Sequence, residues 1–197
     1  MKRVGKSAPI GVFDSGVGGL TVVREIMRQI PNEKIIYFGD TARVPYGSKS
    51  KETVTRYSRQ IIRFLESQEV KAIVIACNTA SAYALPELEK EVGIPIIGVV
   101  KPGAKVASET TKNGKIGVIG TSATINSHSY KTRIQQKNPD IEVFEQDCPL
   151  FVPLVENGFI DRNDMVVKLI VERYMKGLKD AGVDTVILGC THYPILK

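Results

Sequence analysis

The sequence predicts an α/β protein built from two similar domains, each with a parallel sheet. Three observations predict this fold. Apolar runs alternate with amphipathic stretches from end to end, the second half repeats the order of parts in the first, and one apolar run in each half stops on a cysteine. Alternating strands and helices at this pitch are typical of parallel sheets covered by helices. A length of 197 residues is enough for one large domain or two small ones.

The first half is expected to alternate between strands and helices throughout. Its strands are expected where apolar residues run together, over 8–14, 34–40, 72–76 and 94–100. Its helices are expected over 19–30, 51–68 and 84–92. The longest of these has apolar residues at helical spacing, namely Val54, Tyr57, Ile61, Phe64 and Leu65, and Pro86 suits the first turn of the last one.

The second half restarts the pattern of the first. Residues 115–124 (KIGVIGTSAT) echo 9–18 (PIGVFDSGVG), with the triplet Ile-Gly-Val in both. Residues 182–192 (GVDTVILGCTH) echo 69–79 (EVKAIVIACNT). Each half therefore has an opening strand and turn, followed later by a strand that ends on a cysteine. A duplicated α/β domain explains this order, and we expect domains over 1–99 and 100–197.

Two of the three cysteines occupy matching places in the two halves. Cys77 and Cys190 each follow an apolar run, and hydrogen-bonding side chains come directly after them. Active sites of open α/β sheets lie at the carboxyl ends of the strands. A helix beginning just after either cysteine is expected to lower the pKa of its thiol. A single buried cysteine is as often a core residue as a functional one. Two cysteines at matching positions of the two halves favour a functional role. Cys148 has no counterpart, so we interpret it as structural.

The turn after the first strand, FDSGVGG, does not fit a nucleotide site. Its glycines miss the G-x-G-x-x-G spacing because Thr21 stands at the third glycine position, and no G-K-[ST] motif occurs. Asp14 would place a carboxylate against a phosphate, so a proton-handling or ammonium-binding role is expected for it. His192 lies two residues beyond Cys190, where an imidazolium would favour the thiolate. His128 is expected on the surface.

Composition excludes several classes of function. The formal charge of +6 is spread along the chain, and its densest basic stretches also contain acids, so nucleic-acid binding is not expected. The cysteines form no C-x-x-C pair, which argues against a structural zinc site. No apolar run reaches the ~18 residues of a membrane helix, and the N-terminus has no signal-peptide core. A cytoplasmic protein without a membrane association is expected.

Five motifs together resemble those of the glutamate racemase family: FDSGVGG, PYGSKS, ACNTASA, IGTSATINS and GCTHYPIL. The resemblance implies two α/β domains facing each other across a cleft, each giving one cysteine. It implies cofactor-independent interconversion of L- and D-glutamate, supplying D-glutamate for peptidoglycan, with no metal and as a homodimer. Cys77 is then the acid–base residue for D-glutamate and Cys190 for L-glutamate, assisted by Asp14 and His192. The substrate-binding residues implied by the matching motifs are Asp14, Ser15, Tyr46, Gly47, Asn78, Thr79, Thr121, Thr124, Glu156, Thr191 and His192.

Some alternatives stay open from the sequence. An aspartate racemase or related isomerase could use the same cysteine pair, and a non-catalytic binding module could share the scaffold. Contact with DNA gyrase, known for some glutamate racemases, is not favoured without a clustered basic stripe. Members of the family continue some tens of residues beyond THYP with a tail that completes the first domain. Either this chain is a truncated form, which would expose apolar surface and be poorly stable or inactive, or the tail is dispensable, and we expect the first.

Overall fold

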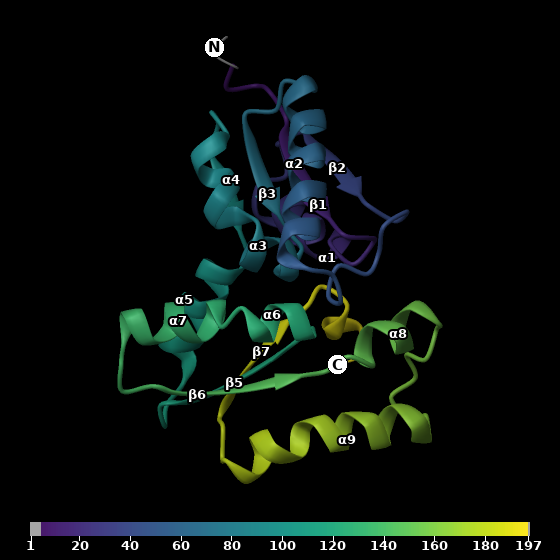
Figure 1. The fold of residues 1–197 in the computed structure, drawn as a ribbon, viewed down its shortest axis with the longest axis vertical. Helices are drawn as coiled ribbons and strands as arrows, with labels where there is room; N and C mark the ends of the chain where they lie inside the picture. The colour runs from purple at the N-terminus through teal and green to yellow at the C-terminus, as the bar shows by residue number, and fades with distance from the viewer. Residues whose placement is uncertain (1–4, 197) are drawn as a thin grey trace. The chain divides into compact units, whose positions relative to one another are not determined.

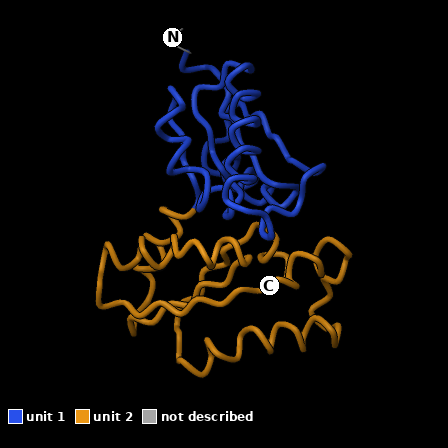
Figure 2. Tube along the Cα trace, in the orientation of Figure 1, with its two compact units in different colours: residues 1–99 blue, residues 100–197 orange. Residues whose placement is uncertain are grey.

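A computed structural model describes residues 5–196, and the chain divides into two compact units, residues 1–99 and 100–197 (Figure 2). Each unit contains one parallel sheet with helices, so the predicted α/β class with two parallel-sheet units is confirmed. Within the described residues, no helix is long and apolar enough to cross a membrane.

The first unit carries a four-stranded sheet in the order β2-β1-β3-β4 (Figure 1). Its strands are β1 (Ile10–Asp14), β2 (Ile35–Gly39), β3 (Ala72–Ile75) and β4 (Ile96–Gly98). Its helices are α1 (Leu20–Gln29), α2 (Lys51–Ser67), α3 (Asn78–Tyr83) and α4 (Leu85–Glu91). Val54, Ile61 and Leu65 of α2 are buried, as their spacing predicted, and pack with residues of the central strands into one core. Phe64, expected on the same face, is 44% exposed. The largest buried members of that core include Phe13, Ile61, Leu65, Ile73 and Ile75.

The second unit carries a three-stranded sheet in the order β6-β5-β7. Its strands are β5 (Lys115–Gly120), β6 (Glu142–Asp147) and β7 (Thr185–Gly189). Its helices are α5 (Val100–Thr110), α6 (Ser122–Asn126), α7 (Ser129–Lys137), α8 (Phe151–Glu156) and α9 (Met165–Asp180), and a 3-10 turn, η1, spans Tyr193–Leu196. Helices α5 and α7 lie on one side of this sheet and α9 on the other (Figure 1).

The two sheets share a topology that matches the sequence repeat. In each, the opening strand is central, the second strand lies on one side, and the strand before the cysteine lies on the other. All pairings are parallel, so the carboxyl ends of the strands gather at one edge of each sheet. Asp14 ends β1 at that edge of the first sheet, and Gly120 and Gly189 pair at that edge of the second.

Helix α1 differs from the other helices of the first unit because none of its residues is buried. Leu20, Met27 and Ile30 expose more than two fifths of their surface, although they belong to a strongly amphipathic pattern. Apolar surface is therefore exposed on the first unit.

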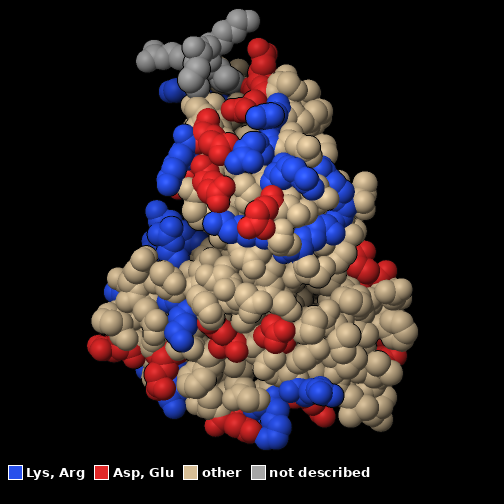
Figure 3. All heavy atoms as spheres, in the orientation of Figure 1, with Lys and Arg blue, Asp and Glu red and all other residues tan. Residues whose placement is uncertain are grey.

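Charged side chains of both signs lie among one another on the face drawn in Figure 3. Several of the basic residues of α2 form ion pairs with α4. Lys51 contacts Glu87 at 3.1 Å, and Arg59 contacts Glu91 at 2.7 Å. Exposed pairs of this kind add little stability.

Candidate active site

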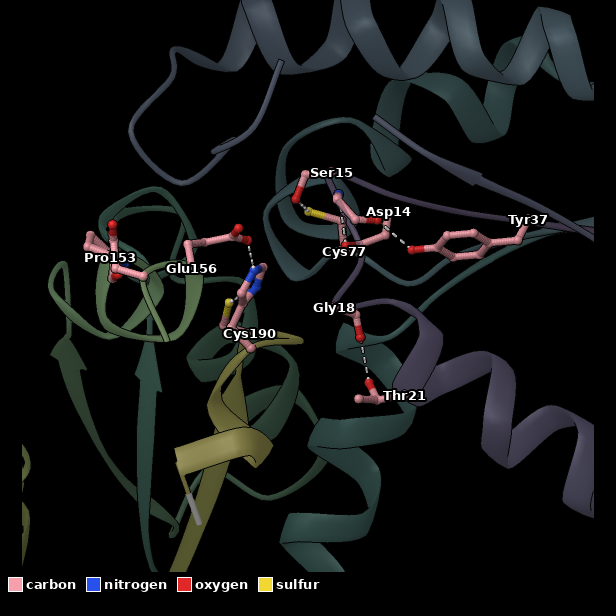
Figure 4. Close-up of polar contacts among 12 residues, drawn as sticks. Asp14, Ser15, Gly18, Thr21, Tyr37, Cys77, Pro153, Glu156 and Cys190 are labelled. Atoms are coloured by element: carbon pink, nitrogen blue, oxygen red, sulfur yellow. Dashed lines mark hydrogen bonds and ion pairs between the residues drawn. The ribbon is translucent and has the colours of Figure 1, made fainter. Parts of the chain in front are cut away.

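Cys77 lies where the carboxyl end of β3 turns into α3. It is the N-cap of α3, and its sulfur accepts a hydrogen bond from the Ala80 N–H at 3.4 Å. The thiol is directed to the Ser15 hydroxyl, with 3.7 Å between sulfur and oxygen (Figure 4). The side chain is 5% exposed. The predicted helix directly after this cysteine is present, and its first turn holds the sulfur.

Asp14 and Ser15 come from the neighbouring strand and lie beside Cys77 (Figure 4). Asp14 is completely buried, and its Oδ2 accepts the Gly16 N–H at 3.0 Å. Burying a carboxylate is costly unless hydrogen bonds compensate it. Asp14 is thus held near the Cys77 thiol by the turn that follows β1.

The pKa of the Cys77 thiol is raised to about 12, first by burial and then by the negative charge of Asp14. The Ala80 N–H and the Ser15 groups act in the opposite direction but do not outweigh these two effects. The sequence-based expectation of a lowered pKa at Cys77 was therefore wrong. A six-residue helix offers one well-placed amide, whereas desolvation penalises the whole charge of a thiolate. Cys77 is protonated at neutral pH in this structure.

The loop that contains Tyr46 and Gly47 is anchored by a buried carboxylate. The ring of Tyr46 is 1% exposed, and its hydroxyl donates to Asp40. Asp40 also pairs with Arg43 at 2.7 Å, and Arg43 stacks 4.3 Å above the Tyr57 ring. The sequence analysis selected Tyr46 but gave no role to Asp40. Its place at the end of a predicted strand was the signal that could have identified it.

The remaining predicted residues of the first unit lie directly behind Cys77. Asn78 and Thr79 form the first turn of α3, and both are buried. The first unit therefore brings together Asp14, Ser15, Cys77, Asn78 and Thr79 at the carboxyl edge of its sheet.

Cys190 follows β7 directly and lies beside His192 in the second unit. Its sulfur is 3.8 Å from His192 Nδ1, and the other ring nitrogen of His192, Nε2, is 2.5 Å from Glu156 Oε1. Glu156 is the last residue of α8. The imidazole is 3% exposed, whereas the Glu156 side chain is 37% exposed. The three side chains therefore form a Cys–His–Glu chain of contacts (Figure 4).

An α-helix does not follow Cys190 in the part of the chain that the structure describes. A single 3-10 turn begins at Tyr193 instead. The described residues end at Leu196, so a longer helix after Cys190 stays a prediction. His192 lies beside the Cys190 thiol, whereas the first turn of α3 contacts the sulfur of Cys77 in the first unit.

Thr121 follows β5 at the position that Ser15 takes after β1, and Thr124 lies three residues further on. Thr121 caps α6, its hydroxyl lies 3.1 Å from that of Thr124, and both side chains are buried. Thr191, between Cys190 and His192, is buried as well. The second unit thus gathers its predicted residues at the same edge of the sheet as the first.

Cys148 shares the apolar core of the second unit with Cys190, and His128 lies at the surface. Cys148 is fully buried in the apolar core of the second unit, and burial raises the pKa of its thiol to about 12. His128 precedes α7 with an exposed side chain that contacts Glu145 at 2.6 Å. Among residues 5–196, no three His, Cys, Asp or Glu side chains gather into a possible metal site.

Residues 10–197 match the Asp/Glu/Hydantoin racemase family, to which the chain therefore belongs. Its relatives within this family are glutamate racemases, which are isomerases. The enzyme of Geobacter metallireducens is 56% identical over 188 residues, 95% of this chain and 69% of the relative. That of Persephonella marina is 57% identical over 95% of this chain and 71% of the relative. The crystal structure of Francisella tularensis glutamate racemase with D-glutamate superposes with a TM-score of 0.90, at 47% identity, over 96% of this chain and 70% of that one.

Proposed function

We propose that the chain interconverts L- and D-glutamate by a cofactor-independent acid–base mechanism with Cys77 and Cys190. The observation that carries the proposal is the matched position of the two thiols. Each follows the corresponding strand of a unit with the same topology, and each has a polar partner from its own unit. Membership of the racemase family supports the reaction type.

The reaction explains why two thiols are needed. Inverting an α-carbon removes a proton from one face and returns a proton to the other, so one base must be ionised while the opposite acid is protonated. Cys77 takes the α-proton of D-glutamate and Cys190 that of L-glutamate. Each turnover leaves the accepting thiol protonated and the donating thiol ionised, so the two roles exchange. The α-proton is a weak acid, so fixed hydrogen-bond donors have to stabilise the carbanion that forms.

The surroundings of the two cysteines suit opposite protonation states. Burial and Asp14 keep Cys77 protonated, which makes it ready to deliver a proton. Around Cys190, the Glu156 carboxylate accepts the Nε2–H of His192 and leaves the Nδ1 lone pair directed to the thiol. His192 can then take the thiol proton while Glu156 stabilises the imidazolium. The enzyme in this state is ready to deprotonate L-glutamate.

The same residues account for binding of an amino acid with two carboxylates. Asp14 provides negative charge for the ammonium group, and that positive charge in turn offsets the effect of Asp14 on Cys77. Hydroxyl and amide groups serve the carboxylates, from Ser15, Asn78 and Thr79 in the first unit and from Thr121, Thr124 and Thr191 in the second. The backbone of Tyr46 and Gly47 contributes from the loop that Asp40 anchors.

The proposal extends to the biological role. Cytoplasmic D-glutamate is required for peptidoglycan, and supplying it is the role that the family resemblance implies, with a homodimer as the working form. An aspartate racemase is the alternative from the same family. Its substrate is one methylene shorter, a difference that a pocket discriminates by about 1–3 kcal/mol.

The test is proton NMR of L-glutamate, D-glutamate and L-aspartate with the purified chain in D2O, without pyridoxal phosphate. The proposal expects loss of the α-proton signal from both hands of glutamate and a much slower loss from L-aspartate. Faster exchange of aspartate would favour the alternative. Exchange of neither amino acid by this chain would leave either truncation or a wrong assignment as the cause, so the measurement is repeated with a chain extended past Lys197. Exchange of neither amino acid by the extended chain would contradict the racemase proposal, and a non-catalytic binding module would then be the better interpretation.

A further inference from the structure

Tyr37 of β2 contacts the turn that carries Asp14, although no motif includes it. Its hydroxyl donates to the Gly16 carbonyl oxygen at 2.6 Å. The backbone N–H of Gly19 is also directed to the phenolic oxygen, and its contribution lowers the pKa of Tyr37. One hydroxyl therefore joins two points of the 14–19 turn (Figure 4).

The packing around this hydroxyl leaves the turn little room to move. A Cβ at Gly19 would come within 2.9 Å of the Tyr37 hydroxyl and 2.5 Å of Asp14 Cβ. A Cβ at Gly39 would lie 2.5 Å from the Gly16 carbonyl oxygen. Real Cβ atoms do not approach other atoms so closely, so the two glycines allow β2 to support the turn directly.

The turn held in this way also holds the Asp14 carboxylate. Gly16 accepts the Tyr37 hydroxyl through its carbonyl and donates its own N–H to Asp14 Oδ2 at 3.0 Å. Burial, followed by the negative charges of Asp14 and Cys77, raises the pKa of Tyr37 well above its usual range. The phenol therefore keeps its proton and stays a donor across the working pH of an enzyme.

We propose that Tyr37 is a positioning residue for the Cys77 half of the reaction. Acting through Gly16, it fixes the carboxylate of Asp14 in the orientation that assists Cys77. This inference rests on the proposed racemase function and adds a residue that the family motifs do not contain. Because Tyr37 acts on one thiol only, removing its hydroxyl is expected to change the isotope effects measured with D- and L-glutamate differently.

The experiment compares Tyr37→Phe with the unchanged chain, using L- and D-glutamate labelled with deuterium at the α-carbon. Losing a hydroxyl that satisfies a partly buried carbonyl costs about 1–2 kcal/mol, so kcat/KM should fall about five- to thirtyfold. Slower chemistry at Cys77 makes proton abstraction from D-glutamate more rate-limiting. The primary isotope effect should therefore rise with D-glutamate and fall with L-glutamate.

Tyr174→Phe is the matched control because it removes a tyrosine hydroxyl from the second unit, where the ring packs on Phe151. Its rates and isotope effects should stay unchanged. Unchanged rates for Tyr37→Phe, or isotope effects that move equally for both hands, would overturn the inference. Absence of glutamate racemisation by the unchanged chain and by the chain extended past Lys197 would instead contradict the proposed function, so the two failures are distinguishable.

A second variant covers the case in which Tyr37→Phe does not fold, as judged by circular dichroism. Gly19→Ala leaves Tyr37 intact but forces a Cβ between its hydroxyl and Asp14. The same opposite movement of the two isotope effects is expected. Isotope effects that change equally for D- and L-glutamate would again refute a role specific to Cys77.

Discussion

Replacing Glu156 by Gln tests the proposed role of the Cys–His–Glu chain at Cys190. Glutamine keeps the shape of the side chain and can still accept the Nε2–H of His192, which lies 2.5 Å from the carboxylate in the structure. It removes only the negative charge that stabilises an imidazolium. The substitution therefore separates charge from geometry.

The expected magnitude follows from the type of hydrogen bond and the exposure of Glu156. Hydrogen bonds to charged groups contribute about 1.5–3 kcal/mol and neutral ones about 0.5–1.5 kcal/mol. The side chain is 37% exposed, so solvent screening favours the lower end of the difference, about 1 kcal/mol. That difference corresponds to about a fivefold loss in the population of the thiolate–imidazolium pair at Cys190.

The assay is the initial rate of α-proton exchange in D2O, measured separately for each hand of glutamate at saturating substrate. Glu156→Gln should slow exchange of L-glutamate about fivefold, and exchange of D-glutamate less, because Cys77 abstracts that proton. Glu145→Gln is the matched control, since Glu145 also contacts a histidine, His128, at 2.6 Å in the same unit. Equal slowing of both hands, or the same loss in the control, would refute the reasoning.

Three further outcomes are expected from the first unit and from the pair of thiols. Cys77→Ser and Cys190→Ser should each abolish racemisation, measured by circular dichroism of glutamate, and full racemisation by either would contradict the two-base mechanism. In Asp14→Asn, loss of the negative charge should lower the pKa of Cys77 from about 12. Thiolate absorbance near 240 nm should then appear at lower pH, and an unchanged titration would show that burial alone sets the pKa. Tyr46→Phe should cost about 1–3 kcal/mol in urea unfolding, because the buried Asp40 carboxylate loses a donor; a stability within error of the unchanged chain would rule out that anchoring.

Periodicity predicted the strands of the first unit. Each begins and ends within two residues of its expected bounds, because strands of parallel sheets appear as short apolar runs. Repetition predicted that an opening strand and a strand before a cysteine return in the second unit, as β5 and β7 do, but no expectation placed β6.

Tertiary contacts that have no motif could not be predicted in this way. In the sequence, Tyr37 is an ordinary residue of a predicted strand. Its hydroxyl gains a role only because β2 pairs with β1, which brings it to the carbonyl oxygen of Gly16. The pKa of Cys77 is a similar case. A helix after the cysteine can be read from the sequence, but the desolvation that opposes it depends on how completely the neighbouring strands bury the sulfur.

The two half-sites reach the same chemistry through different electrostatic surroundings. In the first unit a carboxylate lies near the thiol and keeps it protonated, whereas in the second an imidazole lies between thiol and carboxylate and can accept the proton. By the repeat, Asp14 corresponds to Gly120 and His192 to Thr79, so each unit carries its ionisable neighbour at a position where the other unit has a different residue. In the proposed mechanism one thiol starts as the base while the other is protonated, and the different neighbours of Cys77 and Cys190 suit that division.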